Sequence, residues 1–168
     1  MKVALVAFLF TTFASASAQN QFGPFPSSCG PKDASFDVRL DKSQHSLTQP
    51  ESGKARIYFI DESGGVLGNR TTGTPTMLGI DGAWVGGIRR DSYFSVSVDP
   101  GEHHMCVAAP FYREAKVVVL AHLQVESGKT YFFRTGSVVS GLVLDPLDSD
   151  EGKYLIDSYP LSVSHPKN

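Results

Sequence analysis

An Asp-Gly pair at positions 81 and 82 separates two short apolar runs, residues 76–80 and 83–85. Because a two-residue β-turn needs positive φ angles, Asp-Gly between apolar runs predicts a β-hairpin. Further short stretches with strand composition follow or precede it, with Gly-, Pro- or Ser-containing turns between them. They are residues 36–40, 55–60, 92–98, 102–109, 117–125, 130–134 and 138–144. Many short strands separated by turns predict a mainly β protein, an antiparallel β-sandwich.

One short helix is expected near the C-terminus. Asp148 or Ser149 can cap its first turn, and the acidic side chains of Asp150 and Glu151 suit a helix N-terminus. Pro160 requires the helix to end before it. The predicted fold is therefore an antiparallel β-sandwich with one short C-terminal helix.

The first 18 residues have the pattern of a secretory signal peptide. Lys2 precedes an apolar run at residues 3–14, and Ala16-Ser17-Ala18 matches an A-x-A cleavage site. A membrane anchor would need about 20 apolar residues, more than this run offers. We therefore expect cleavage after Ala18 and an exported, soluble mature protein, periplasmic or secreted, without a membrane span.

The remaining chain divides by composition into three parts. Residues 19–53 start with a Gly-, Pro- and Ser-rich segment and are expected to form an extended leader. Residues 54–160 hold most of the predicted strands and the helix, and are assigned to the β-sandwich domain. Residues 161–168 are left as a C-terminal tail.

Cys29 and Cys106 are the two cysteines of the sequence. An even count in an oxidising compartment favours a disulfide between them, and two buried unpaired thiols are the alternative. If residues 102–109 and 117–125 form a hairpin about Arg113, His104 lies opposite His122. Cys106 then shares their face, and a disulfide would lay the leader over this face and cover Leu120.

Composition and motifs exclude several functions. The 15 Lys and Arg residues are balanced by 17 Asp and Glu residues, so the net charge is −2. The chain therefore lacks the excess of positive charge that binds nucleic acid. The sequence contains no GxSxG elbow, no HExxH or CxxC spacing and no glycine-rich phosphate loop before a helix. We therefore expect a protein that is not an enzyme and has no cofactor.

Two groups of side chains still deserve a functional interpretation. His104 and His122 on adjacent strands, joined by Glu102, could share a zinc or copper ion, which makes a metal-binding protein or a metal-dependent hydrolase the main alternative. Trp84 and Tyr93 could form a stacking platform for a sugar or a peptide, as in a carbohydrate-binding module. Ordinary core packing would explain these aromatic residues equally well.

An ordered series of short motifs resembles a known family. It consists of Gly53-Lys54-Ala55-Arg56-Ile57-Tyr58-Phe59, Ile80-Asp81-Gly82-Ala83-Trp84-Val85-Gly86, Ser92-Tyr93-Phe94, Pro100-Gly101-Glu102-His103-His104 and Gly128-Lys129-Thr130-Tyr131-Phe132. The series is similar to the bacterial family called domain of unknown function 2846, and to the PEGA-type β-sandwich modules of the cell envelope. The resemblance implies a β-sandwich and export, and it implies no activity. The chain lacks the acylation site of the lipoprotein members.

The sequence thus predicts an exported, non-catalytic β-sandwich protein with an envelope-associated or interaction role. An envelope protein or a glycan is the expected partner. Because binding residues usually lie on loops over a rigid scaffold, the loops around Trp84 and residues 62–74 are the expected binding surface.

Overall fold

The computed structural model describes residues 19–23, 29–43, 47–63, 74–110, 116–138 and 141–167. At residues 19–23, 110, 116, 117, 137 and 138 the description is limited to the backbone. The predicted signal peptide at residues 1–18 lies outside the described residues, as does most of the predicted binding loop at residues 62–74.

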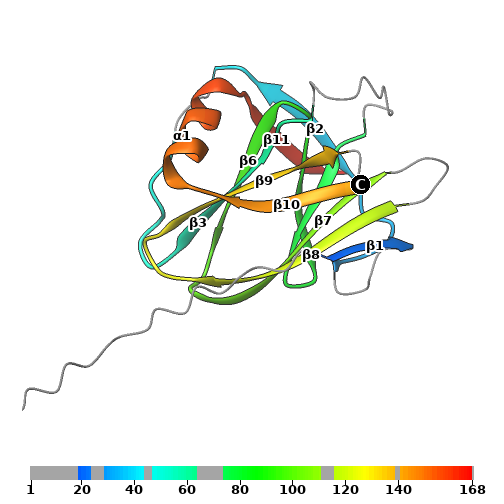
Figure 1. The fold of residues 1–168 in the computed structure, drawn as a ribbon, viewed down its shortest axis with the longest axis horizontal. Helices are drawn as coiled ribbons and strands as arrows, with labels where there is room; N and C mark the ends of the chain where they lie inside the picture. The colour runs from blue at the N-terminus through cyan, green and yellow to red at the C-terminus, as the bar shows by residue number, and fades with distance from the viewer. Residues whose placement is uncertain are drawn as a thin grey trace, which may run out of the picture.

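In the part of the chain that the structure describes, two β-sheets form two layers, and a single helix lies at one end (Figure 1). Sheet A has the strand order β1-β8-β7-β4-β5, and sheet B has the order β10-β9-β3-β6-β11-β2. The strands of sheet A are β1 (Gln19–Gly23), β8 (Lys116–Val125), β7 (Gly101–Pro110), β4 (Thr76–Ile80) and β5 (Ala83–Ile88). Those of sheet B are β10 (Gly141–Leu147), β9 (Thr130–Val138), β3 (Ala55–Asp61), β6 (Ser92–Val98), β11 (Leu161–Pro166) and β2 (Phe36–Asp41). The helix is α1 (Ser149–Ser158).

The core lies between the two sheets. Ile57 and Phe59 of sheet B are fully buried, and they belong to one apolar cluster with Leu78, Val107 and Val119 of sheet A. Burial of such side chains is the main favourable term in folding. The structure confirms the predicted β-sandwich with one short helix, with one refinement. Strand β3 pairs with β9 in parallel, and β11 pairs with β6 in parallel, whereas the other pairs are antiparallel.

The register predicted for the hairpin of β7 and β8 is confirmed. Ala109 pairs with Val117, and His104 pairs with His122. Met105 and Val107 face the core, as do the residues paired with them on β8. The alternation of the two strands therefore leaves His104 and His122 on the outer face of sheet A.

The Asp-Gly hairpin and the helix cap are also confirmed. Asp81 and Gly82 have φ angles of 51° and 78°, the positive values that the turn between β4 and β5 requires. At the start of α1, the side chain of Asp148 accepts hydrogen bonds from the backbone N–H groups of Asp150 and Glu151. This cap satisfies two donors that a helix end leaves without intrahelical partners.

The disulfide between Cys29 and Cys106 is present, with 5.6 Å between the two Cα atoms. It fastens the leader to the outer face of sheet A, as predicted, and creates a second small apolar cluster there. Both cysteines are buried in that cluster, together with Phe36, Val38, Met77, Ala108 and Val118. Leu120 is partly buried and packs against the cluster, so the leader does cover this part of the face.

The predicted domain boundaries were too narrow. Strand β2 lies in the predicted leader, and residues 161–166 of the predicted tail form β11. Both belong to sheet B, where β11 lies between β6 and β2. The prediction of one strand at residues 138–144 also differs from the structure, in which Val138 ends β9 and β10 begins at Gly141. Short segments such as β11 obtain their strand conformation from their neighbours in the sheet, which local composition does not reveal.

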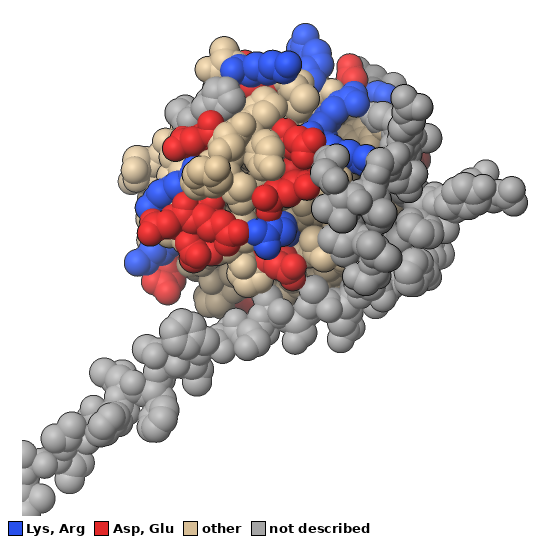
Figure 2. All heavy atoms as spheres, turned by 45° about the horizontal axis from the view of Figure 1, so that its top comes forward, with Lys and Arg blue, Asp and Glu red and all other residues tan. Residues whose placement is uncertain are grey.

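Charged side chains on the face that carries α1 are paired locally. Figure 2 shows Asp and Glu side chains on this face with Lys and Arg side chains between them. The guanidinium group of Arg134 contacts the carboxylates of Glu62 and Glu151, and Lys153 Nζ lies 3.6 Å from an oxygen of Asp150. Arg134 and Lys153 therefore each lie beside at least one carboxylate on this face.

Candidate functional site

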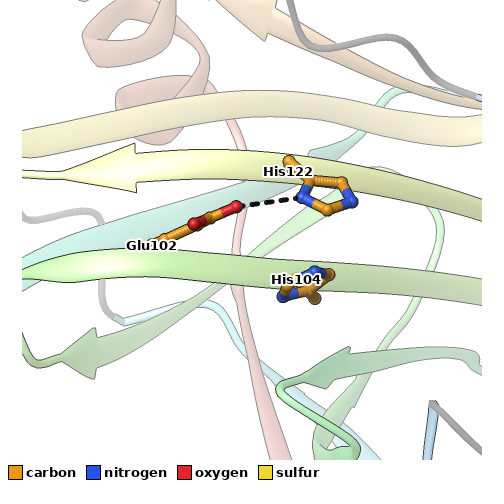
Figure 3. A group of neighbouring side chains, drawn as sticks. All are labelled: Glu102, His104 and His122. Carbon is orange, nitrogen blue, oxygen red and sulfur yellow. Dashed lines mark hydrogen bonds and ion pairs between the residues drawn. The ribbon is translucent and has the colours of Figure 1, made fainter.

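Glu102, His104 and His122 lie together on the outer face of sheet A (Figure 3). Glu102 and His104 are two residues apart on β7, so their side chains leave the same face of the strand. His122 on β8 is the cross-strand partner of His104. All three side chains are exposed.

The three side chains are close enough to share one ligand. One potential ligand atom from each residue lies within 4.8 Å of the others. His122 Nδ1 is 3.4 Å from Glu102 Oε1, and the centroids of the two imidazole rings are 4.0 Å apart. Two imidazoles and a carboxylate are ligands that Zn²⁺ and Cu²⁺ accept in proteins.

Asp81, in the turn between β4 and β5, fixes the backbone beside this group. One oxygen of its carboxylate accepts a hydrogen bond of 2.9 Å from the backbone N–H of His104. The other oxygen lies 2.6 Å from His103 Nδ1, and His103 Nε2 lies 2.7 Å from the carbonyl oxygen of Asp99. Because both nitrogens of the His103 ring face acceptors, the doubly protonated imidazolium is the form that satisfies both contacts.

The pKa values of this pair shift in the directions that these contacts require. Burial lowers the pKa of His103, but the hydrogen bonds to Asp99 and Asp81 outweigh burial and raise it above its ordinary value of 6.5. Burial likewise opposes ionisation of Asp81, and the hydrogen bonds from His104 and His103 outweigh it and lower its pKa below 3.8. The pair therefore binds the β4–β5 turn to β7 most strongly when both groups are charged.

We expect replacement of His103 with Gln to lower the free energy of unfolding by about 1–2 kcal/mol at pH 5, because a charge-assisted hydrogen bond is lost. The pair contributes fully to the free energy of unfolding between pH 3.8 and pH 6.5, which are the ordinary pKa values of Asp81 and His103. This contribution declines as the pH rises through the raised pKa of His103. Urea unfolding at pH 5 and pH 9 measures the difference, with exposed His165→Gln as the control. Equal losses at the two pH values would contradict a charged His103.

A hollow with a volume of 430 Å³ lies beside the two histidines on the outer face of sheet A. Its lining combines the imidazoles and the hairpin turn with apolar groups. The lining residues are Asp81, Gly82, His104, Met105, Cys106, Leu120, Ala121 and His122. The hollow therefore joins a potential metal site to a mostly apolar surface next to the disulfide.

The predicted stacking platform of Trp84 and Tyr93 is wrong. Tyr93 is 2% exposed and lies in sheet B, where its ring is 6.1 Å from that of Tyr58. Trp84 lies in sheet A and is partly buried against the disulfide cluster. Its Nε1 donates a hydrogen bond of 2.9 Å to the carbonyl oxygen of Pro31. Both rings serve packing, Tyr93 beneath α1 and Trp84 over the leader.

Asp61 is a second ionisable group with an unusual environment. It ends β3 with 1% of its surface exposed, and one carboxylate oxygen accepts hydrogen bonds from the backbone and the hydroxyl group of Ser63. Its neighbours in sheet B are Ser92 on β6 and Thr135 on β9. Burial raises the pKa of Asp61 from 3.8 to about 6, because the ionised carboxylate loses its hydration.

Comparison with known proteins gives one relative. An uncharacterised protein of Haemophilus influenzae (strain ATCC 51907 / DSM 11121 / KW20 / Rd) is 28% identical over 132 residues, which cover 76% of this chain and 73% of that protein. No family model and no solved structure matches the chain. The resemblance to domain of unknown function 2846 therefore stays a prediction. Within the described residues, no helix is both long and apolar enough to cross a membrane.

Proposed function

We propose that this chain is an exported, non-enzymatic β-sandwich protein with an envelope-associated binding role, and that the outer face of sheet A is its binding surface. The observation that carries the proposal is the hollow on this face, whose wall includes the disulfide-bonded Cys106. Disulfides persist in oxidising compartments, which agrees with the signal-peptide pattern of residues 1–18.

Two ionisable groups beside the hollow, Asp81 and His103, are held in hydrogen bonds. A general base needs a free acceptor within reach of its substrate. Both oxygens of Asp81 are already engaged by His103 and by the backbone of His104. The two nitrogens of His103 are engaged as well. These groups support the shape of the face, and the role that we propose for it is recognition of an envelope protein or a glycan.

Export is tested by expressing residues 1–168 in a Gram-negative host and separating periplasm, medium and cytoplasm. We expect a product outside the cytoplasm that begins at Gln19, has lost its first 18 residues and contains no free thiol. A matched chain that starts at residue 19 should stay in the cytoplasm with reduced cysteines. Full-length protein with free thiols in the cytoplasm would refute the proposal.

Binding is tested separately by NMR titration of the oxidised protein with a panel of envelope glycans and peptides. We expect amide shifts at residues 104–106 and 120–122, which line the hollow, and none at α1 on the opposite sheet. A Leu120→Glu variant places a charge in the hollow and should abolish the shifts. Shifts confined to other surfaces would place the binding site elsewhere and contradict this part of the proposal.

A further inference from the structure

We propose that Glu102, His104 and His122 bind one divalent transition-metal ion, Cu²⁺ more tightly than Zn²⁺. The inference rests on the proposed function of the outer face of sheet A as a binding surface, and it adds a metal ion to the groups that this face presents. The three residues form the one group of three or more potential metal ligands found within the described part of the chain.

The distances fit a metal ion with small side-chain movements. Zinc bonds of about 2.1 Å in a tetrahedral site place neighbouring ligand atoms about 3.4 Å apart. His122 Nδ1 and Glu102 Oε1 are already 3.4 Å apart. His104 completes the group within 4.8 Å and is exposed, so rotation of its side chain can bring a ring nitrogen closer.

The backbone that carries the ligands is held in place before any ion binds. Paired strands β7 and β8 set His104 opposite His122, and the disulfide of Cys106 anchors β7 two residues further along. The carboxylate of Asp81 holds the backbone N–H of His104. Binding therefore needs the ordering of three side chains and no rearrangement of the sheet, which lowers its entropic cost.

The donor set selects the class of metal. Two imidazole nitrogens and one carboxylate oxygen suit Cu²⁺, Ni²⁺ and Zn²⁺, whereas Ca²⁺ and Mg²⁺ prefer sites built of oxygen ligands. For a given site of this kind, affinity rises along the first-row series to Cu²⁺ and falls at Zn²⁺. Three protein ligands leave at least one coordination position open, and the neighbouring hollow is lined by the same two histidines.

The test is a titration of metal-free, disulfide-bonded protein with Cu²⁺ and, separately, with Zn²⁺, followed by calorimetry and by electron paramagnetic resonance of the Cu²⁺ form. We expect one ion per chain and nitrogen hyperfine structure from two imidazoles. His104→Ala with His122→Ala should weaken binding about 100-fold or more, and Glu102→Gln about 10-fold. The matched control His165→Ala removes an exposed histidine of sheet B and should leave binding unchanged.

A gain of affinity provides a second, independent measurement. Gln124 is the cross-strand partner of Glu102 and shares the face of His122. Gln124→His would supply a fourth ligand, and we expect binding to tighten about 10-fold or more. An unchanged affinity would contradict an ion located between these two strands.

The outcomes separate this inference from the proposed function. Absence of stoichiometric binding, or equal binding by the double variant, refutes the metal site while export and the disulfide can still be observed. A reduced, cytoplasmic product refutes the proposed function whatever the protein does with Cu²⁺. Hydrolysis of a simple ester by the Zn²⁺ form, lost in the double variant, would support the metal site and replace the non-enzymatic role with that of a metal-dependent hydrolase.

Discussion

Replacing Cys29 and Cys106 together with alanine is expected to lower the free energy of unfolding by about 4 kcal/mol. The two residues are 77 positions apart, so the disulfide removes much of the conformational freedom of the unfolded chain. The bond also holds the segment at Cys29 against the outer face of sheet A, where both cysteines are buried in an apolar cluster. Without it, that cluster would depend on packing alone.

Urea denaturation of the oxidised wild type and of the double variant measures the loss. The wild type treated with an excess of a dithiol is the matched control, and it should unfold at the same urea concentration as the variant. The fluorescence of Trp84 reports on this segment, because its indole donates a hydrogen bond to the carbonyl oxygen of Pro31, close to Cys29. A loss below about 1 kcal/mol would show that packing of the leader, and not the covalent link, holds this segment.

Replacing Asp61 with asparagine is expected to raise the free energy of unfolding by about 3 kcal/mol at pH 8. The reason is the difference between the pKa of about 6 in the folded protein and the ordinary value of 3.8, at about 1.4 kcal/mol for each pH unit. Asparagine has nearly the same shape, and its carbonyl oxygen can accept the hydrogen bonds that Ser63 donates. The cost of a buried charge is thereby removed.

The pH dependence fixes the sign of this effect. A carboxylate whose pKa is raised on folding destabilises the protein above the folded pKa of about 6, and the penalty disappears as the pH falls towards 3.8. The free energy of unfolding of the variant should therefore exceed that of the wild type at pH 8 and equal it at pH 3.5. Asp145→Asn, at an exposed position, is the control and should change stability little at either pH. A constant gain at both pH values would contradict a buried charge at Asp61.

The outer face of sheet A could be predicted because its signals are local. Side chains point alternately to the two faces of a strand, which decides which residues of 102–109 and 117–125 share a face. The position assumed for the turn then decides which residues of the two strands lie opposite each other. The pairing of His104 with His122 and the placement of Cys106 follow from these two facts. The position of Glu102 on the same face follows as well, because it is two residues from His104 along the strand.

Other features depend on partners that are distant in sequence. Asp81 and Gly82 identify a turn, but nothing local indicates that the Asp81 carboxylate reaches His103 and the backbone of His104. The burial of Asp61 and Tyr93 depends on their positions in sheet B and on the segments that cover it. An alternating pattern shows which residues share a face of a strand, and it does not show which face is covered.

Strand β11 has a consequence for the order in which the molecule can be completed. It occupies a place between β6 and β2, so sheet B remains interrupted until residues 161–166 have been synthesised. Before that moment, β6 and β2 each present an open edge whose backbone groups can pair with another chain. Sheet B therefore cannot close until residues 161–166 are available to pair with β6 and β2.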